Sequence, residues 1–169
     1  LLRIHRLEVT VAYPFLLAVY SDFAAGTRTE DDVCAILDVV ENLVVRRFVC
    51  GVPTYGLNKT FAPLYEQARK GDDFLGRLKM TLSSNTRNYP RDEEFRERLG
   101  TARLYGGGDR LKKTKLILER LEVGQGHKEI VPGTTLTIEH VMPQTLTDTW
   151  KTDLGESWDE DHEQYLHTL

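Results

Sequence analysis

The pair Glu139-His140 combines the two side chains that metal-assisted hydrolysis of a phosphodiester bond requires. A carboxylate can hold a hard cation such as Mg²⁺, and a neutral imidazole, with a reference pKa of about 6.5, can take a proton from water. Residues 135–138 alternate with β-branched residues and predict a strand that leads into this pair. Successive strand residues point to opposite faces, so both side chains can serve one point only if the chain bends here, as Pro143 permits.

An acid-histidine dipeptide is common by chance, so the pair by itself has two interpretations. In one, His140 is a general base and Glu139 is a metal ligand. In the other, His140 is a structural histidine at the end of a strand and Glu139 is a solvated carboxylate. Three further histidines have no partner at ligand spacing and are expected on the solvated surface, namely His5, His127 and His162.

Apolar periodicity predicts that residues 1–128 form a helical bundle. The clearest helix follows Thr29, a good N-cap with acidic residues after it, and ends near Gly51. Pro14 is expected to kink the first helix or to lie in its first turn. Helices are expected over residues 9–25, 58–70, 72–82, 90–104 and 109–123, with shorter ones over 147–151 and 159–169. Composition changes after Lys128, which predicts a second, mixed α/β module over residues 129–169.

The overall charge gives no indication of a nucleic-acid partner. The chain has 169 residues and a formal net charge of -4, although such a balance can hide a local basic patch. The densest basic run lies on the helix predicted after Gly108, and a solvated helix face is its simplest interpretation. Its members are nevertheless the best candidates for contacts to a DNA backbone: Arg110, Lys112, Lys113 and Lys115.

Cysteine usage and apolar runs bear on the cellular setting. Cys34 and Cys50 are not part of a CxxC or Cys/His cluster, so neither a disulfide framework nor a structural zinc site is indicated. No apolar run approaches the ~18 to 20 residues that cross a bilayer, and the start lacks the layout of a signal peptide. We therefore expect a cytoplasmic protein without a membrane partner.

The residues around the Glu139-His140 pair resemble a known nuclease motif. The segment Ile138-Glu139-His140-Val141-Met142-Pro143-Gln144 is similar to the first strand and turn of HNH (ββα-metal) nucleases. Weaker similarities occur in a consistent order along the chain, and together they resemble the GmrSD-like modification-dependent (type IV) restriction endonucleases. These weaker similarities lie at residues 46–51, 56–61, 89–95 and 165–169, with Trp150 between the last two.

The resemblance implies a metal-dependent DNA endonuclease that hydrolyses phosphodiester bonds of modified phage DNA. His140 would be the general base, and Glu139 would hold a divalent metal such as Mg²⁺. Gln144 and His167 are further candidates for support of the site, and packing of a helix-face histidine against Leu166 or Leu169 is an equally good interpretation of His167. The resemblance also implies that the chain is a fragment, with the rest of the ββα module after Leu169. A nucleotide-using domain would precede the helical region, so the fragment would be inactive alone.

A second function remains open for residues 1–128. This part can be a non-catalytic helical interaction or scaffold module that links an NTPase-like domain to the nuclease. The oligomeric state, the base modification and the nucleotide are not indicated by the sequence.

Overall fold

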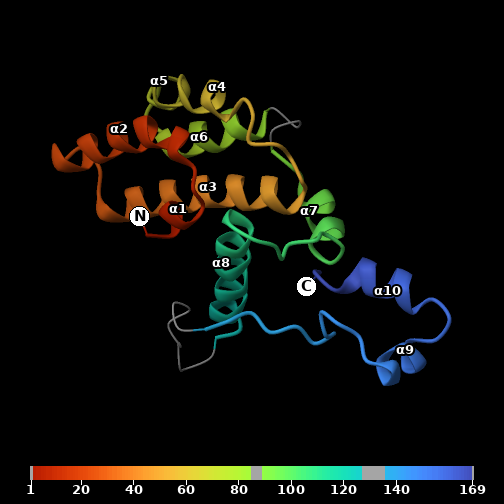
Figure 1. The fold of residues 1–169 in the computed structure, drawn as a ribbon. Helices are drawn as coiled ribbons and strands as arrows, with labels where there is room; N and C mark the ends of the chain where they lie inside the picture. Colours follow the sequence, from red (N-terminus) through yellow and green to blue (C-terminus); the bar gives the residue numbers. More distant parts are fainter. Residues whose placement is uncertain (1, 85–88, 127–135, 169) are drawn as a thin grey trace. The chain divides into compact units, whose positions relative to one another are not determined.

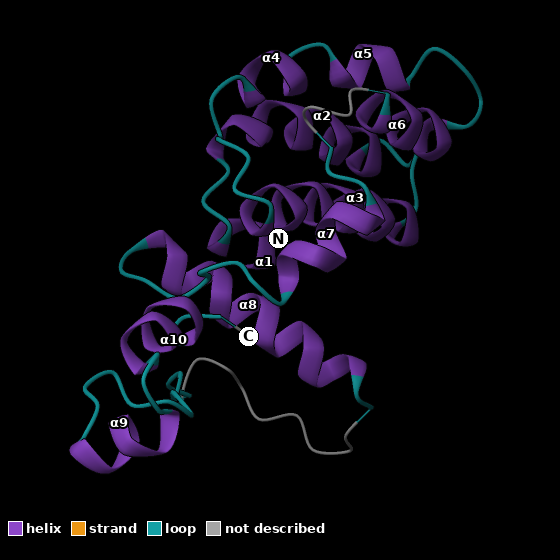
Figure 2. Cartoon of the chain, turned by 90° about the vertical axis from the view of Figure 1, so that its right-hand side faces the viewer, coloured by secondary structure: helices purple, strands orange, loops and turns teal. Residues whose placement is uncertain are grey.

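The computed structural model describes residues 2–84, 89–126 and 136–168. Within these ranges every regular element is a helix, and no strand occurs among them (Figure 2). The elements are α1 Leu2–Arg6, the 3-10 helix η1 Thr10–Ala12, α2 Tyr13–Ala24, α3 Glu30–Val49, α4 Leu57–Phe61, α5 Leu64–Ala68, α6 Phe74–Ser83, α7 Asp92–Leu99, α8 Asp109–Gly124, α9 Asp148–Leu154 and α10 Trp158–Tyr165. The prediction of a mainly α-helical protein is confirmed.

The chain divides into two compact units, residues 1–95 and residues 96–169. Helix α7 crosses the division. The sequence-based domain boundary between residues 128 and 129 rests on a change of composition, and it stays a prediction.

The first unit is built in layers on the long helix α3 (Figure 1). Helices α2 and α6 both pack against α3, and α5 packs against α2 and α6 from the other side. Phe15 of α2 and Phe61 of α4 meet in the core with ring centroids 6.1 Å apart, and each is only 2% exposed. Burial of such apolar side chains is the main force that holds these helices together.

The start of α3 confirms the predicted cap. The Thr29 hydroxyl accepts a hydrogen bond from the backbone N–H of Asp32 at 3.1 Å, and the Asp32 carboxylate accepts one from the backbone N–H of Thr29 at 2.8 Å. This reciprocal capping box satisfies two backbone donors that the helix leaves unpaired. The backbone N–H of Thr29 and its hydroxyl, which lies 2.8 Å from the Asp32 carboxylate, stabilise that carboxylate and lower the pKa of Asp32.

Two prolines make the observed helices shorter than the periodicity predicts. The helix expected over residues 9–25 begins only at Tyr13, with Pro14 in its first turn, as one of the two expected outcomes. The helix expected over residues 58–70 is split into α4 and α5 at Pro63. Proline lacks a backbone N–H and clashes with the preceding turn, so it favours a helix start over a helix interior.

Asn58 has a side chain that suits an N-cap, but it is not the cap of α4. Gly56, with φ +86°, is the N-cap residue, and Asn58 lies inside the helix. A left-handed backbone of this kind costs glycine little, whereas a residue with a Cβ is strained there. The glycine rather than the asparagine therefore sets the start of this helix.

The second unit is organised by α8, which starts and ends where the glycines predict. Gly108 precedes it with φ +62° and ψ -130°, a backbone conformation typical of glycine. The buried residues of the helix are Lys113, Thr114, Leu116 and Ile117. Helices α9 and α10 pack against each other further along the chain.

The predicted strand before Glu139 is not confirmed. Residues 136–140 have no regular secondary structure, and Thr135 lies outside the described residues. A strand is stabilised by hydrogen bonds to a neighbouring strand, and the described part of the chain contains no such neighbour. The start of a ββα module is therefore not seen as a strand, and it remains part of the proposal below.

Two smaller expectations can also be compared with the structure. Cys34 is exposed and Cys50 is buried, and both are free thiols. No helix in the described ranges has the length and apolar character that a membrane span needs.

Candidate functional site around His140

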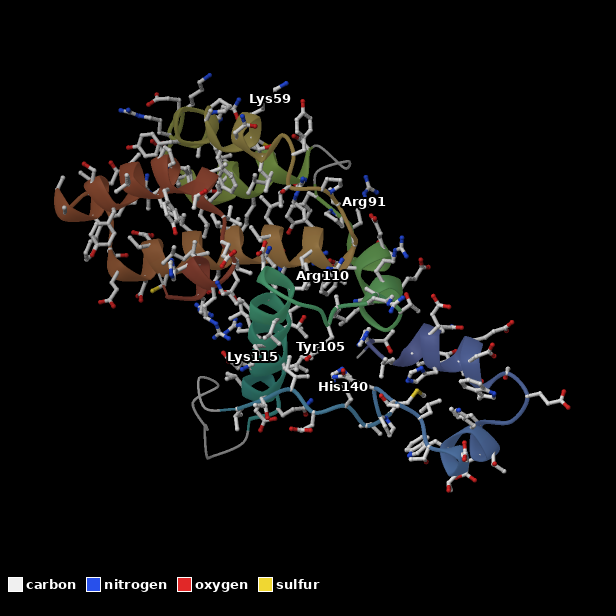
Figure 3. All side chains as sticks on the ribbon, viewed as in Figure 1. Lys59, Arg91, Tyr105, Arg110, Lys115 and His140 are labelled. Carbon is white, nitrogen blue, oxygen red and sulfur yellow. The ribbon has the colours of Figure 1, made fainter. Side chains whose placement is uncertain are left out.

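Helix α8 anchors two distant segments of the second unit through neighbouring residues. The hydroxyl of Thr114 donates a hydrogen bond to the carbonyl of Leu104 at 2.6 Å, and the Lys115 ammonium donates one to the carbonyl of Leu136 at 2.7 Å. Thr114 and Leu104 are almost fully buried, at 2% and 1% exposure. The helix therefore fixes the segment at Leu104 and the segment that leads to Glu139 (Figure 3).

A third segment joins them after α10. The backbone N–H groups of Leu104 and Tyr105 both donate to the carbonyl of His167, at 2.9 and 3.4 Å. These bonds connect parts of the chain that are far apart in sequence. Because Leu104 is itself held by α8, the backbone at His167 is tied to the same support.

Three rings meet where these segments converge. The ring of Tyr105 contacts that of His140 edge to face, with centroids 4.4 Å apart and planes at 89°. The ring of His167 lies 5.4 Å from Tyr105 and 5.5 Å from His140. Edge-to-face and tilted contacts at these distances are favourable because a ring's electron-rich face attracts the positive edge of another. We call Tyr105, His140 and His167 the ring cluster.

The two nitrogens of His140 have different surroundings. Nδ1 lies 3.4 Å from the amide nitrogen of Gln144, a weak contact in which the amide is the donor. Nε2 is buried and has no conventional hydrogen-bond partner among the residues that the structure describes. In a neutral ring with this pattern, Nε2 carries the proton and Nδ1 is the basic nitrogen.

The Glu139 carboxylate has different surroundings from the His140 imidazole. Its side chain is exposed, and its carboxylate accepts a hydrogen bond from the Thr137 hydroxyl at 3.1 Å. The chain bends at Val141 and Met142, directly after His140. The carboxylate is thus open to solvent and to a cation, while the imidazole beside it packs into the ring cluster.

His167 belongs to the site by position. Its Nδ1 is buried, and no hydrogen-bond partner for it occurs within the described part of the chain. Burial, reinforced by Arg103 and then His140, lowers the pKa of His167 below its usual value, so the imidazole is neutral at neutral pH. The sequence-based view that His167 supports the site stays a prediction, and its ring contact with His140 is what speaks for it.

The expectation for His162 is wrong. Its Nε2 lies 3.0 Å from the carbonyl of Pro143, and the residue is partly buried. It therefore ties α10 to the turn that follows His140 and is not a freely solvated histidine. His5 is exposed as expected, and His127 lies outside the described residues.

The basic residues of α8 are largely engaged within the protein. Lys113 is 9% exposed and pairs with Asp109 at 3.4 Å, and Lys115 holds the carbonyl of Leu136. Arg110 donates to the carbonyl of Arg103. A basic side chain that makes an internal hydrogen bond is less available to bind a phosphate. The role of this run in DNA contact therefore stays a prediction.

The donor set near Glu139 can be tested for its fit to a metal. No group of three histidine, cysteine, aspartate or glutamate side chains able to hold a metal occurs among the described residues. This arrangement does not suit a structural zinc ion, which needs four protein ligands. Mg²⁺ is different, because it keeps several waters and commonly uses one or two carboxylates plus substrate phosphate oxygens. An exposed Glu139 carboxylate fits Mg²⁺ in chemical type.

Sequence reasoning missed Tyr105 and Thr114. Tyr105 directly precedes the glycine run 106–108, and Thr114 lies within the basic run on α8. The predictions for these two segments concerned the glycines and the basic residues instead. A threonine on the buried side of a charged helix was the available hint, since a buried hydroxyl needs a partner. No periodicity indicates that its partner is the residue before Tyr105.

The comparison with protein families identifies this part of the chain. Residues 89–169 match the family described as GmrSD restriction endonucleases, C-terminal domain. The matched range includes the whole ring cluster, Glu139 and α8. Over this range the chain is similar to the GmrSD restriction endonucleases, and the match supports a relationship with that family. Searches among curated proteins and among solved structures found no match.

Proposed function

We propose that the second unit is the part of an HNH-type, metal-dependent endonuclease that begins the active site at Glu139 and His140. The observation that carries the proposal is the family match of residues 89–169, within which an exposed carboxylate directly precedes a histidine whose Nδ1 makes only a long contact of 3.4 Å with the Gln144 amide among the described residues. The reaction is hydrolysis of a DNA phosphodiester. Its biological role is the restriction of modified phage DNA in the cytoplasm.

His140 acts as the general base in this proposal. A water molecule that replaces the weakly bound Gln144 amide can donate its hydrogen bond to Nδ1 and lose its proton there. The oxygen then attacks phosphorus, and the leaving oxygen departs on the opposite side. Gln144 supports the site by keeping Nδ1 the acceptor before the water arrives, which preserves the reactive tautomer.

Glu139 would hold the cation. A Mg²⁺ bound by this carboxylate, by waters and by phosphate oxygens would supply positive charge that stabilises the added negative charge at phosphorus. The carboxylate is suited to this because it is exposed and has only the Thr137 hydroxyl as a hydrogen-bond donor among the described residues. Arg110, Lys112, Lys113 and Lys115 would contribute to holding the DNA backbone.

The decisive experiment is DNA cleavage by the full-length protein with Mg²⁺ and nucleotide, on phage DNA with modified bases and on an unmodified copy. Wild-type protein should cut the modified DNA, and His140→Ala should abolish cleavage while the circular dichroism spectrum is retained. His5→Ala is the matched control, because His5 is exposed on α1 and should leave cleavage unchanged. Equal cleavage by wild type and His140→Ala would remove His140 from the mechanism.

The metal role needs its own variant. Glu139→Gln keeps size and hydrogen bonding but removes the charge, so cleavage should fall sharply and require more Mg²⁺. DNA binding in the absence of Mg²⁺ should not weaken. A Glu139→Gln protein with unchanged Mg²⁺ dependence would exclude this carboxylate as the ligand.

A second function is proposed for the first unit. Arg46 is occupied by Asp92, Asn42 and the carbonyl of Pro90, and Arg47 is 3% exposed, so these two basic side chains serve the fold and not a phosphate. This favours a helical scaffold that links the nuclease to an NTPase-like domain. Arg46→Met should lower thermal stability, with DNA affinity unchanged.

A further inference from the structure

His140 lies on a segment whose backbone does little to orient it. Residues 136–147 have no regular secondary structure. The segment is tied at its ends by the Lys115 bond to Leu136 and by the His162 contact with the carbonyl of Pro143. In a strand, ladder hydrogen bonds on every second residue would fix each side chain's direction. Here the direction of the imidazole must be set by what the ring itself touches.

Hydrogen bonds do not hold the imidazole firmly either. Within the described ranges the imidazole has one conventional contact, from the Gln144 amide to Nδ1, which is 3.4 Å long and involves an exposed side chain. Nε2 is buried, and none of the described residues is a conventional partner for it. A buried N–H without any acceptor costs free energy, so such a group needs an explanation in its surroundings.

The nearest ring supplies that explanation. Tyr105 meets His140 at 4.4 Å with the two planes at 89°. An aromatic face is a weak acceptor for an N–H group, and a perpendicular approach is the geometry of that interaction. The His167 ring closes the cluster at 5.5 Å from His140, a longer contact.

The backbone at Tyr105 is itself held in place by hydrogen bonds. Its backbone N–H and that of Leu104 both bond to the carbonyl of His167. Leu104 is 1% exposed, and its carbonyl is held by the buried Thr114 hydroxyl of α8 at 2.6 Å. A series of contacts thus links the buried Thr114 of α8, through the backbone at Leu104, to the Tyr105 ring and to the His140 imidazole.

We propose that Tyr105 is a positioning residue for His140, whose ring face holds the imidazole edge-on so that Nε2–H is turned inward and Nδ1 outward toward water. The proposal rests on the proposed function and deepens it. It assigns to a residue outside the Glu139-His140 motif the task of presenting the basic nitrogen. Misplacement of a reacting group by about 1 Å can cost about 100-fold in rate, so a ring that fixes the base acts on turnover and not on DNA binding.

Two substitutions separate the ring from the hydroxyl. Tyr105→Phe keeps an aromatic face and should retain kcat within about 3-fold, whereas Tyr105→Leu keeps apolar bulk without a face and should lower kcat by about 10- to 100-fold with KM unchanged. Tyr165→Leu is the matched control, since Tyr165 is 49% exposed on α10 and lies outside the ring cluster. It should leave both constants unchanged.

A spectroscopic measurement tests the same contact without catalysis. With ¹³C-labelled histidine in the full-length protein, the ring signal of His140, assigned through His140→Gln, should carry the ring-current shift of a neighbouring aromatic face. That shift should persist in Tyr105→Phe, disappear in Tyr105→Leu and remain in Tyr165→Leu. Thermal unfolding of each variant checks that the fold is intact.

The outcomes distinguish this inference from the function on which it rests. If wild type cleaves and His140→Ala does not, the function stands. If Tyr105→Leu then has wild-type kcat and a His140 signal that keeps the wild-type ring-current shift, the positioning role alone is overturned. If the wild-type protein cuts no DNA, the proposed function fails, while the spectroscopic result still decides whether Tyr105 orients the ring. An equal loss of kcat in Tyr105→Phe and Tyr105→Leu would assign the effect to the hydroxyl and overturn the proposal.

Discussion

The hydrogen bond from Thr114 to Leu104 makes a quantitative prediction about the second unit. Thr114→Val replaces a hydroxyl by a methyl group of similar size, so it opens no cavity. Threonine and valine also have similar helix propensity, so α8 itself is little affected. A hydroxyl carries one proton, and the shorter of its two contacts, 2.6 Å to Leu104 against 2.9 Å to Arg110, identifies the carbonyl that loses its donor.

The size of the effect follows from burial. Thr114 is 2% and Leu104 is 1% exposed, so water cannot replace the lost donor. An unsatisfied buried acceptor costs about 1–3 kcal/mol, which corresponds to about 5- to 150-fold in the folding equilibrium. Thr152→Val is the matched control, because Thr152 makes the same kind of bond to Asp148 on an exposed helix. It should change stability by less than about 0.5 kcal/mol.

Urea unfolding followed by tryptophan fluorescence measures this stability difference in the second unit. The chain has two tryptophans, and both Trp150 and Trp158 lie in the second unit. Thr114→Val should move the fluorescence midpoint to lower urea with an unchanged slope, and Thr152→Val should leave it in place. Equal midpoints for the two variants would refute the view that α8 holds the segment at Leu104 through this hydroxyl.

Two further predictions concern single side chains. Thr29→Ala should destabilise the first unit by about 1 kcal/mol through loss of the α3 cap, whereas Thr29→Ser should not. Thermal unfolding followed by circular dichroism measures both variants, and equal melting temperatures would contradict the capping role. Burial lowers the pKa of His167 in the folded protein, so the stability that the neutral ring contributes is complete above its usual value of 6.5 and is lost as pH falls through that value toward the lowered one. The fluorescence midpoint should therefore drop between pH 7.5 and pH 5.5 in wild type and drop less in His167→Gln; parallel pH profiles would argue against this assignment.

The helices that the sequence predicted correctly are those whose ends depend on neighbouring residues. The capping box of Thr29 and Asp32 and the glycines at either end of α8 act over three or four residues, so their signals are local and visible in the sequence. The later start of α2 at Pro14 and the split of the next predicted helix at Pro63 also have local causes. There the apolar periodicity continued past a residue that cannot donate a hydrogen bond, and the hydrogen bond decided the boundary.

The local sequence could not decide whether a strand forms before Glu139. Alternating β-branched residues favour an extended backbone, but a strand exists only where a second segment pairs with it. Among the described residues no such segment pairs with residues 136–140. The strand prediction is therefore not confirmed, because regular structure in this segment depends on contacts that a single segment does not specify.

The sequence by itself identified Glu139 and His140 as candidates for chemistry, because this pair and the residues around it form a contiguous motif. The family match of residues 89–169 agrees with the resemblance that the motif carries. Only the tertiary structure decided what surrounds His140. Tyr105 and His167 reach it through hydrogen bonds and ring contacts between segments that are distant in the chain. Those contacts arise because the backbone at Leu104 is buried against α8 and must find partners there, a requirement that no local pattern of residue types expresses.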